Sequence, residues 1–217
     1  MDANVGTVIV VGGGDALDPS VHELLPDADL VIAADAGVDH AARIGLHVDV
    51  AVGDFDSVTA AGLQAAVAAG AHVERHATDK DAIDLELAFH AARHAGADRV
   101  VVVGLDGGRL DLFVANLLLL ASPDFADLAV EAIIGEAHVF VIRNELTISG
   151  RPGDLLSLLP VNGLARAVTT EGLRYPLHAE DLPAGTSRGC SNEFLSPVAR
   201  VTIEAGTLLA IVPGATR

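Results

Sequence analysis

The sequence predicts an α/β fold in which an N-terminal parallel sheet with helices precedes a C-terminal all-β, sandwich-like domain. Up to about residue 125, apolar strand-like runs alternate with helix-like stretches, which is the pattern of a parallel α/β sheet. Beyond that point the runs are short and alternating, and Gly and Pro separate them, as is typical of an antiparallel sandwich or barrel. The 217 residues, 51% of them hydrophobic, are enough to bury both cores. We therefore expect an α/β domain over residues 1–125 and a β-sandwich domain over residues 126–217.

The elements of the first domain follow one another as apolar strands and Ala- or Leu-rich helices. The expected strands are 7–13, 29–37, 48–52, 72–77 and 99–104. The expected helices are 38–46, 59–70, 81–96 and 112–122. Parallel strands end on the same edge of their sheet, and ligands bind in the crevice beyond that edge.

The expected strands of the second domain are short and closely spaced. They are 129–134, 137–143, 145–150, 154–161, 165–170, 199–205 and 207–213. The sequence shows no long linker and no internal repeat.

The chain is strongly acidic, with 13 Lys and Arg against 30 Asp and Glu and a formal net charge of −17. This balance argues against a nucleic-acid partner, because phosphate backbones are bound by clustered Lys and Arg. A small polyanionic substrate remains compatible, since a bound divalent cation can invert the field of an acidic site.

The sequence also favours a cytoplasmic protein that binds no membrane. The single cysteine, Cys190, excludes an internal disulfide framework and suits a reducing compartment. No apolar run reaches membrane-spanning length. The first ten residues lack the basic region and small-residue cleavage site of a secretory signal.

The segment 48–58, VDVAVGDFDSV, carries the most informative motif, because it places Asp54 and Asp56 at the carboxyl end of an expected strand. Side chains at positions i and i+2 of a strand share a face and can converge on one ion. Together with Gly53, which allows close approach, the two carboxylates suit Mg²⁺. The alternative interpretation is a loop in which Asp54 caps the next helix and Asp56 faces water.

A second acidic cluster follows the fourth expected strand. Its polar members are Thr78, Asp79, Lys80, Asp81, Asp84 and Glu86. If Thr78 or Asp79 caps the following helix, Asp81 and Asp84 lie on one helical face. Acidic residues in a first turn are also favoured by the helix dipole alone. Asp84, however, stands among apolar residues, where a carboxylate is costly unless it is paired or coordinated. Lys80 could hold a phosphate as a point charge.

The third motif, LDGGRLD at 105–111, follows the fifth expected strand. Its two glycines allow a tight turn that projects Arg109 and Asp111, and the Arg fork suits a phosphate. Taken alone, this motif favours a surface pair of Arg109 and Asp111, with Asp111 as a helix N-cap. Asn116, on the following helix, is expected to be a satisfied buried amide.

The glycine-rich segment 12–14 leaves the first expected strand but lacks the spacing of a dinucleotide fingerprint or a P-loop. It is either a permissive turn or a loop that presents backbone N–H groups to an anion. Considered together, the strand exits carry carboxylates and cations on one edge of a sheet. That combination predicts a Mg-dependent phosphoryl or pyrophosphoryl transferase.

The ordered motifs resemble the thiamine pyrophosphokinase family over nearly the whole chain. They are AADAG, VGDFDS, KDAID, GGRLD with Asn116, GLRYPL and SRGCSNEF. The resemblance implies transfer of pyrophosphate from ATP to the hydroxyethyl group of thiamine. It also implies a homodimer in which thiamine lies between the α/β domain of one subunit and the β domain of the other.

The resemblance further implies roles for individual residues. Asp54, Asp56 and Asp84 would be Mg²⁺ ligands. The residues that would line the nucleotide and acceptor pocket are Asp35, Lys80, Asp81, Arg109 and Asp111. Asp81 or Asp84 would accept the alcohol proton, and Arg109 or Lys80 would hold the transferred group. Ser191 and Asn192 would contact thiamine, in a loop shaped by Ser187 and Arg188.

This chain departs from the family pattern at three positions, where Ala36, Ile83 and Leu112 replace the usual Gly, Thr and His. These departures affect rate and acceptor choice more than fold. Ile83 and Leu112 keep open a pyrophosphokinase that acts on another small alcohol such as a pterin. A second alternative is a non-catalytic thiamine- or nucleotide-binding regulator, against which the intact Asp54, Asp56, Asp84 and Arg109 argue.

Overall fold

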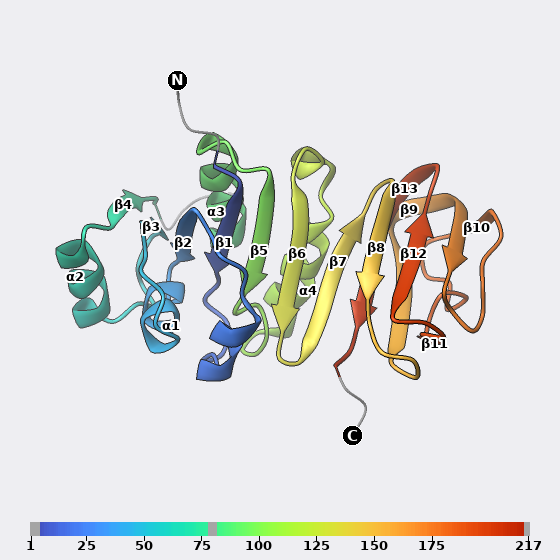
Figure 1. Ribbon diagram of the computed structural model, residues 1–217. Helices are drawn as coiled ribbons and strands as arrows, with labels where there is room; N and C mark the ends of the chain where they lie inside the picture. The colour runs from blue at the N-terminus through green and yellow to red at the C-terminus, as the bar shows by residue number, and fades with distance from the viewer. Residues whose placement is uncertain (1–4, 78–81, 215–217) are drawn as a thin grey trace. The chain divides into compact units, whose positions relative to one another are not determined.

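The computed structural model describes residues 5–77 and 82–214, which form two compact units (Figure 1). The first unit comprises the chain up to residue 119 together with residues 127–135, and the second comprises residues 120–126 and the chain from residue 136 onward. The first unit is α/β and the second is β-rich, as the sequence predicts. No helix in the described residues is long and apolar enough to cross a membrane.

The sheet of the first unit is parallel. Its strands are β1 (Thr7–Val11), β2 (Leu30–Ala34), β3 (Val50–Gly53), β4 (His72–Arg75), β5 (Arg99–Val103) and β6 (Ala129–Ile134). They lie in the order β4-β3-β2-β1-β5-β6, and each pairing is parallel. Since the chain builds outward from β1 on one side and then continues with β5 on the other, the strand order reverses between β1 and β5. In such sheets this reversal opens the crevice in which ligands bind.

Strand β6 corrects one expectation, because the sequence pattern assigns residues 129–134 to the antiparallel domain. The strand instead pairs in parallel register with β5, where Arg99 lies opposite Ala129 and Val103 opposite Ile133. Its sequence alternates locally like a strand of the β domain, but its parallel pairing with β5 assigns it to this sheet. The Arg99 guanidinium also contacts the Glu131 carboxylate across the two strands.

The helices of the first unit are α1 (Gly37–Arg43), α2 (Ala60–Ala69), α3 (Asp84–His94) and α4 (Leu110–Leu120), with a short 3₁₀ turn, η1 (Pro19–Leu24). Another 3₁₀ turn, η2 (Pro123–Phe125), lies in the second unit. Helix α2 begins where the Thr59 hydroxyl accepts from the Gly62 N–H, and it ends at Gly70 in the left-handed conformation (φ 111°). Helix α1 and helix α2 lie against each other near β3 (Figure 1).

The start of α3 differs from the sequence-based expectation. Ile83, which makes no side-chain capping bond, precedes the first helical residue, Asp84. The described helix therefore begins three residues later than the expected start at residue 81. Residues 78–81, including Lys80 and Asp81, lie outside the described residues.

The second unit is an antiparallel β domain. Its strands are β7 (Ala137–Ile142), β8 (Glu145–Ser149), β9 (Leu155–Glu171), β10 (Glu180–Leu182), β11 (Asn192–Glu193), β12 (Val198–Thr202) and β13 (Ala205–Val212). They lie in the order β7-β13-β9-β12-β8, and β10 and β11 also pair with β9. The expected strands 154–161 and 165–170 form one strand, β9, whose register against β13 shifts near Asn162 (φ 59°) and Gly163 (φ 127°). Because of this irregularity, one bent strand has the sequence pattern of two.

The glycine-rich loop after β1 packs against the loop after β5. The N–H groups of Gly12, Gly14 and Asp15 donate to the carbonyls of Val103, Gly104 and Asp106, at 2.8, 2.9 and 2.6 Å. These three N–H groups are therefore used within the protein, which favours the turn over the anion-binding loop as the interpretation of this segment. The glycines allow the two backbones to approach closely, since a Cβ on Gly14 would lie 2.3 Å from the Asp106 carbonyl oxygen.

This packing predicts that substitution by Ala destabilises the protein at Gly14 but not at its neighbour Gly13. Gly14→Ala should cost about 1–3 kcal/mol, because the added Cβ overlaps two backbone carbonyls, and it should lower the melting temperature by several degrees. Gly13→Ala is the matched control, since its Cβ would meet its nearest atoms at 3.5 Å, an ordinary contact. Calorimetric melting of both variants checks this expectation, and equal melting temperatures would contradict it.

Candidate active site

The carboxylates of Asp35, Asp54 and Asp56 gather beyond the carboxyl ends of β2 and β3. Each offers an oxygen that lies within 4.8 Å of the others. The parallel register that sets Ala34 opposite Val52 makes the two strands end together, so residues that follow them meet. The convergence that the sequence predicts for Asp54 and Asp56 is present, and Asp35, expected in the nucleotide pocket, joins them.

The backbone around this acidic cluster takes unusual conformations. Asp35 has φ 48°, Phe55 has φ 64° and Gly53 has φ 143°. Left-handed conformations at residues other than glycine cost free energy and are often found at functional sites. Glycine is required at position 53, because a Cβ there would also lie 3.3 Å from the Asp35 nitrogen and 3.4 Å from Asp84 Oδ1. That short distance brings Asp84, the first residue of α3, to the cluster.

Local hydrogen bonds orient the carboxylates. The N–H of Asp56 donates to Asp54 Oδ1 at 3.2 Å, and the Ser57 hydroxyl donates to Asp56 Oδ1 at 2.8 Å. Thr59, rather than Asp54, caps the next helix. The capping alternative for Asp54 is therefore wrong.

Asp35 is the most buried member of the cluster, with 7% of its surface exposed. Burial raises the pKa of its carboxyl; a hydrogen bond from Ser57 opposes this rise, and the nearby charges of Asp84, Asp56 and Asp54 add to it. Among the described residues, no group hydrogen-bonds its buried Oδ1 atom. A buried oxygen without a donor is costly, and a hard divalent cation satisfies such an oxygen. The donor set and the orphaned oxygen fit Mg²⁺.

The acidic cluster forms part of the wall of a cavity of about 510 Å³, a size typical of small-molecule sites. All its lining residues belong to the first unit. They come from the loops after β1, β2, β3 and β5 and from α3 and α4, and include Gly13, Asp35, Asp54, Asp56, Asp84, Arg109 and Asn116. Asn116, half-buried on α4, thus faces a cavity rather than a closed core.

Arg109 and Asp111 form the surface pair that the third motif alone suggests. Arg109 Nη2 lies 2.5 Å from Asp111 Oδ2, and Arg109 Nε lies 3.1 Å from Oδ1. The guanidinium holds the pKa of the Asp111 carboxyl below its usual range. Helix α4 begins at Leu110, so Asp111 stands inside the first turn and is not the N-cap. The pair orients Arg109, which lines the cavity.

Comparisons with known proteins cover both units. The thiamin pyrophosphokinase catalytic-domain model matches residues 21–132, and the vitamin B1 binding-domain model of the same family matches residues 140–208. The chain belongs to the thiamin pyrophosphokinase family.

Individual relatives of this family agree over nearly the whole chain. Thiamine pyrophosphokinase of Bacillus subtilis (strain 168) is 26% identical over 94% of this chain and 96% of that protein. A crystal structure of the Bacillus subtilis enzyme superposes with a TM-score of 0.84, at 25% identity, over 97% of this chain and 100% of that one. The Geobacillus thermodenitrificans structure gives a TM-score of 0.80 at 26% identity, over 97% and 98% of the two chains.

The region that matches the family's vitamin B1 binding domain contains Ser191 and Asn192. Ser191 is exposed and left-handed (φ 53°), and its N–H donates to the Ser157 hydroxyl at 3.0 Å. Asn192 is buried, and its amide is occupied by the backbone of Tyr175: Oδ1 accepts from the Tyr175 N–H at 3.0 Å and Nδ2 donates to the Tyr175 carbonyl at 2.7 Å. Asn192 therefore shapes the loop that presents Tyr175, and a direct contact with thiamine stays a prediction.

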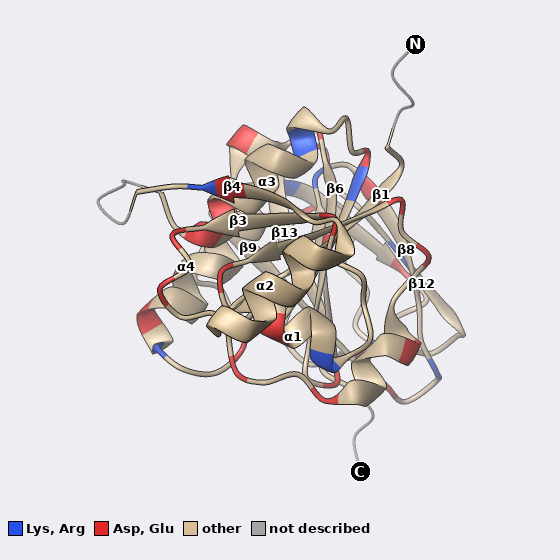
Figure 2. Ribbon diagram, turned by 90° about the vertical axis from the view of Figure 1, so that its left-hand side faces the viewer, with Lys and Arg blue, Asp and Glu red and all other residues tan. Residues whose placement is uncertain are grey.

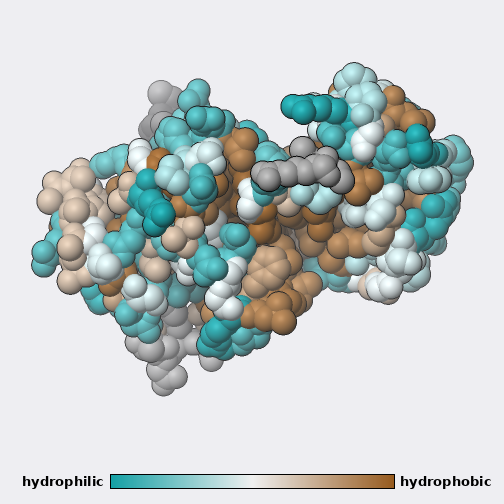
Figure 3. All heavy atoms as spheres, turned by 90° about the horizontal axis from the view of Figure 1, so that it is seen from below, coloured by the Kyte–Doolittle hydropathy of each residue, from teal (hydrophilic) through white to brown (hydrophobic). Residues whose placement is uncertain are grey.

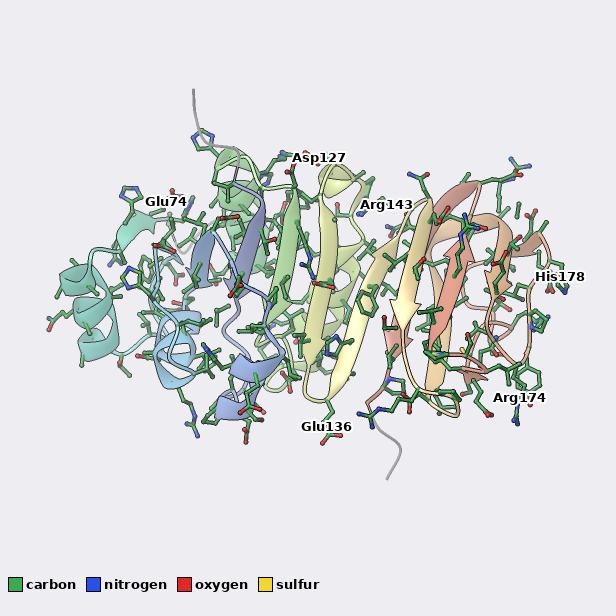
Figure 4. The ribbon with its side chains drawn as sticks, in the orientation of Figure 1. Glu74, Asp127, Glu136, Arg143, Arg174 and His178 are labelled. Atoms are coloured by element: carbon green, nitrogen blue, oxygen red, sulfur yellow. The ribbon has the colours of Figure 1, made fainter. Side chains whose placement is uncertain are left out.

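Ion pairs brace the same part of the second unit. Arg174, labelled in Figure 4, pairs with Glu193 at 3.0 Å. Arg188 reaches Glu180 through two nitrogens, at 3.0 and 2.9 Å. Arg188 thereby ties the SRGCSN loop to β10, as expected for a residue that shapes the loop.

Sequence reasoning missed Ser57 and the central place of Asp35. Ser57 carries no motif of its own beyond its position after Asp56. Asp35 directly follows an apolar strand, and Asp54 does the same; that shared position is the signal that points to it.

The buried Asp35 predicts a pH-dependent gain of stability on substitution. A raised native pKa means that the carboxyl's favourable contribution is complete below its unfolded pKa of about 3.9 and is lost as pH rises through the native value. Asp35→Asn, which tolerates a positive φ, should therefore melt about 2–4 °C above the parent at pH 7 without divalent cations, and nearly level with it near pH 3.5. Thermal melts at both pH values check this. Exposed Asp27 serves as the control through Asp27→Asn, and a gain that is the same at both pH values would contradict the expectation.

Proposed function

We propose that this chain transfers pyrophosphate from ATP to the hydroxyethyl oxygen of thiamine with Mg²⁺, giving thiamine diphosphate and AMP. One observation carries this proposal: within a family-matched catalytic domain, clustered carboxylates with an orphaned buried oxygen line a cavity at the strand ends. A pure binding protein has no need of such a cation site.

Asp54, Asp56 and Asp84 are the proposed Mg²⁺ ligands, and the orphaned oxygen of Asp35 adds a fourth donor. When bound, the ion neutralises phosphate charge and assists the departure of AMP. The surrounding negative charge makes this neutralisation necessary (Figure 2), since bare ATP would be repelled.

The remaining cavity residues position the reacting groups. The guanidinium of Arg109, oriented by Asp111, would bind the transferred pyrophosphoryl group through two parallel N–H donors. Lys80 would contribute a further positive charge. The thiamine hydroxyl oxygen attacks the β-phosphorus of ATP, the bond to the α–β bridging oxygen breaks, and AMP leaves. Asp81 or Asp84 would accept the hydroxyl proton. Catalysis is then mainly positioning and charge stabilisation.

The second unit is the proposed thiamine-binding domain, in agreement with its family match. Tyr175 is 56% exposed although its backbone is fixed by Asn192, and Leu195 is 55% exposed on the paired segment. An exposed aromatic ring on a backbone held in place suits the cationic thiazolium of thiamine. Ser191 would supply a polar contact nearby.

Helix α4 supports the proposed homodimer. Its exposed side chains include Leu110, Leu112, Val114 and Leu118, at 75, 40, 46 and 50% exposure. Exposed hydrophobic surface is visible in brown in Figure 3. An isolated surface helix would carry polar residues there, and apolar patches of this kind mark protein interfaces.

The proposed location of the protein is the cytoplasm.

The deciding experiment is one incubation of the purified chain with ATP, Mg²⁺ and thiamine, in which AMP and thiamine diphosphate are followed. Equal amounts of both products support the proposal. Because Ile83 and Leu112 line the cavity, a panel of other small alcohols, including a pterin, tests the acceptor. Binding of thiamine and nucleotide by calorimetry without AMP release would instead indicate a regulator.

Replacement of Asp56 separates catalysis from stability. Asp56→Asn removes a cation ligand from an exposed position, so turnover should fall by about a hundredfold or more while the melting temperature stays nearly constant. Steady-state rates across a Mg²⁺ titration check this, with Asp27→Asn as the charge-matched control. A variant with parental turnover would remove Asp56 from the site.

Disruption of α4 tests the dimer. Leu118→Glu places a charge in the proposed interface, so the assembly should change from a dimer of 22.2 kDa chains to a monomer. Size-exclusion chromatography with light scattering measures the mass directly. A monomeric parent protein, or a variant that stays dimeric, would contradict this interface.

A further inference from the structure

Phe55, between Asp54 and Asp56, is the residue whose conformation sets the direction of both carboxylates. It adopts φ 64°, although it is a bulky residue rather than glycine. Such a conformation is strained and persists only where neighbouring groups hold it. The ring is partly buried against the apolar core of the first unit. That packing holds the ring but leaves the backbone carbonyl beside it to be fixed by another group.

Arg75 supplies that group. It is the last residue of β4, next to Glu74, which Figure 4 labels, and it lies opposite Gly53 in the parallel register. Its Nη1 donates to the backbone carbonyl of Asp54 at 2.8 Å, and its guanidinium carbon lies 4.8 Å from the centre of the Phe55 ring. One side chain thus binds two consecutive residues of the acidic loop. Arg75 is not among the described residues that line the cavity.

We propose that Arg75 is a positioning residue that locks Phe55 in its left-handed conformation and thereby holds Asp54 and Asp56 in a geometry that binds a divalent cation. This inference rests on the proposed function, because it concerns the same cation site. A guanidinium suits the task, since it can donate to a carbonyl while it covers an aromatic face.

The sign of the effect separates positioning from simple electrostatics. Arg75 carries a positive charge close to a cation site, so by Coulomb repulsion alone its removal would tighten cation binding. If Arg75 positions the loop, its removal weakens cation binding instead. Exposed Arg43, on α1 of the same unit, provides the charge-matched control.

The test measures Mn²⁺ binding to the full chain without nucleotide, by electron paramagnetic resonance of the free ion. Arg75→Ala should raise the dissociation constant about five- to thirtyfold, the combined effect of one cation–π contact and one hydrogen bond. Arg75→Lys, which keeps a cation over the ring, should recover part of this loss. Arg43→Ala should leave the constant unchanged or slightly lower.

A double-mutant cycle makes the mechanism specific. Phe55→Leu removes the aromatic partner, so adding Arg75→Ala to it should cost less than Arg75→Ala alone. Circular dichroism confirms that each variant is folded. If Arg75→Ala does not fold, the cycle is measured with Arg75→Lys and Phe55→Leu instead. Arg75→Ala that binds Mn²⁺ as tightly as the parent, or more tightly, overturns the inference. The inference is also overturned if the effects of Arg75→Ala and Phe55→Leu on Mn²⁺ binding simply add.

Failure of this inference differs from failure of the proposed function. A parent chain that binds Mn²⁺ but forms no thiamine diphosphate contradicts the proposed reaction and leaves the Arg75 effect measurable. A parent chain that binds no Mn²⁺ overturns both. If the parent chain forms thiamine diphosphate but Arg75→Ala binds Mn²⁺ as tightly as the parent, only the role of Arg75 is overturned.

Discussion

Mutual repulsion among carboxylates at the ends of β2 and β3 is the constraint on which the rest of the site depends. Asp35, Asp54 and Asp56 place oxygens within 4.8 Å of one another, and a fold gains nothing from such an arrangement by itself. Burial is the main cause of the raised pKa of the Asp35 carboxyl, and the nearby charges of Asp84, Asp56 and Asp54 raise it further. The cluster persists because the surrounding sheet is well packed: β1, β2 and β5 bury nearly every side chain. Stability supplied by the core therefore offsets a local cost that the proposed cation would remove.

The backbone of these loops is also held in unfavourable conformations by contacts elsewhere in the protein. Asp35 and Phe55 are held with positive φ at the ends of adjacent strands, and each turns its loop so that carboxylates face one point. The supports differ in kind. Asp35 is held by burial. Phe55 is held by contacts of its ring with the core and with Arg75. At the far end of the loop, the Asp39 carboxylate accepts hydrogen bonds from both the N–H and the hydroxyl of Thr59, each at 2.7 Å. The proposed cation site would gain its preorganisation from these contacts.

The strand exits could be predicted well because parallel pairing follows from the alternation of apolar runs and helices, and parallel strands end together. Asp54 and Asp56 could therefore be grouped from their positions along the chain, whereas the third member of the group in the structure is Asp35 rather than the expected Asp84. What could not be predicted depends on contacts between distant residues. Strand β6 resembles the β domain locally, and only its pairing with β5 assigns it to the parallel sheet. Likewise, no local signal shows that Asn192 uses its amide to bind Tyr175, or that Phe55 is left-handed without a glycine.

The cavity combines this acidic wall with apolar side chains, and the combination explains how a few charged groups can act strongly. Ile83, Leu85, Leu105, Leu112 and Phe113 line the same space as the carboxylates. Electrostatic interactions strengthen where apolar side chains displace water, so these side chains would strengthen the effect of the nearby charges. Ile83 and Leu112 stand where the family usually carries a hydroxyl and an imidazole, so this chain has shifted its cavity further toward the apolar side. Such a shift would remove two polar groups from the proposed acceptor site but leaves every proposed cation ligand in place. It therefore bears on acceptor affinity and rate rather than on the chemistry of transfer.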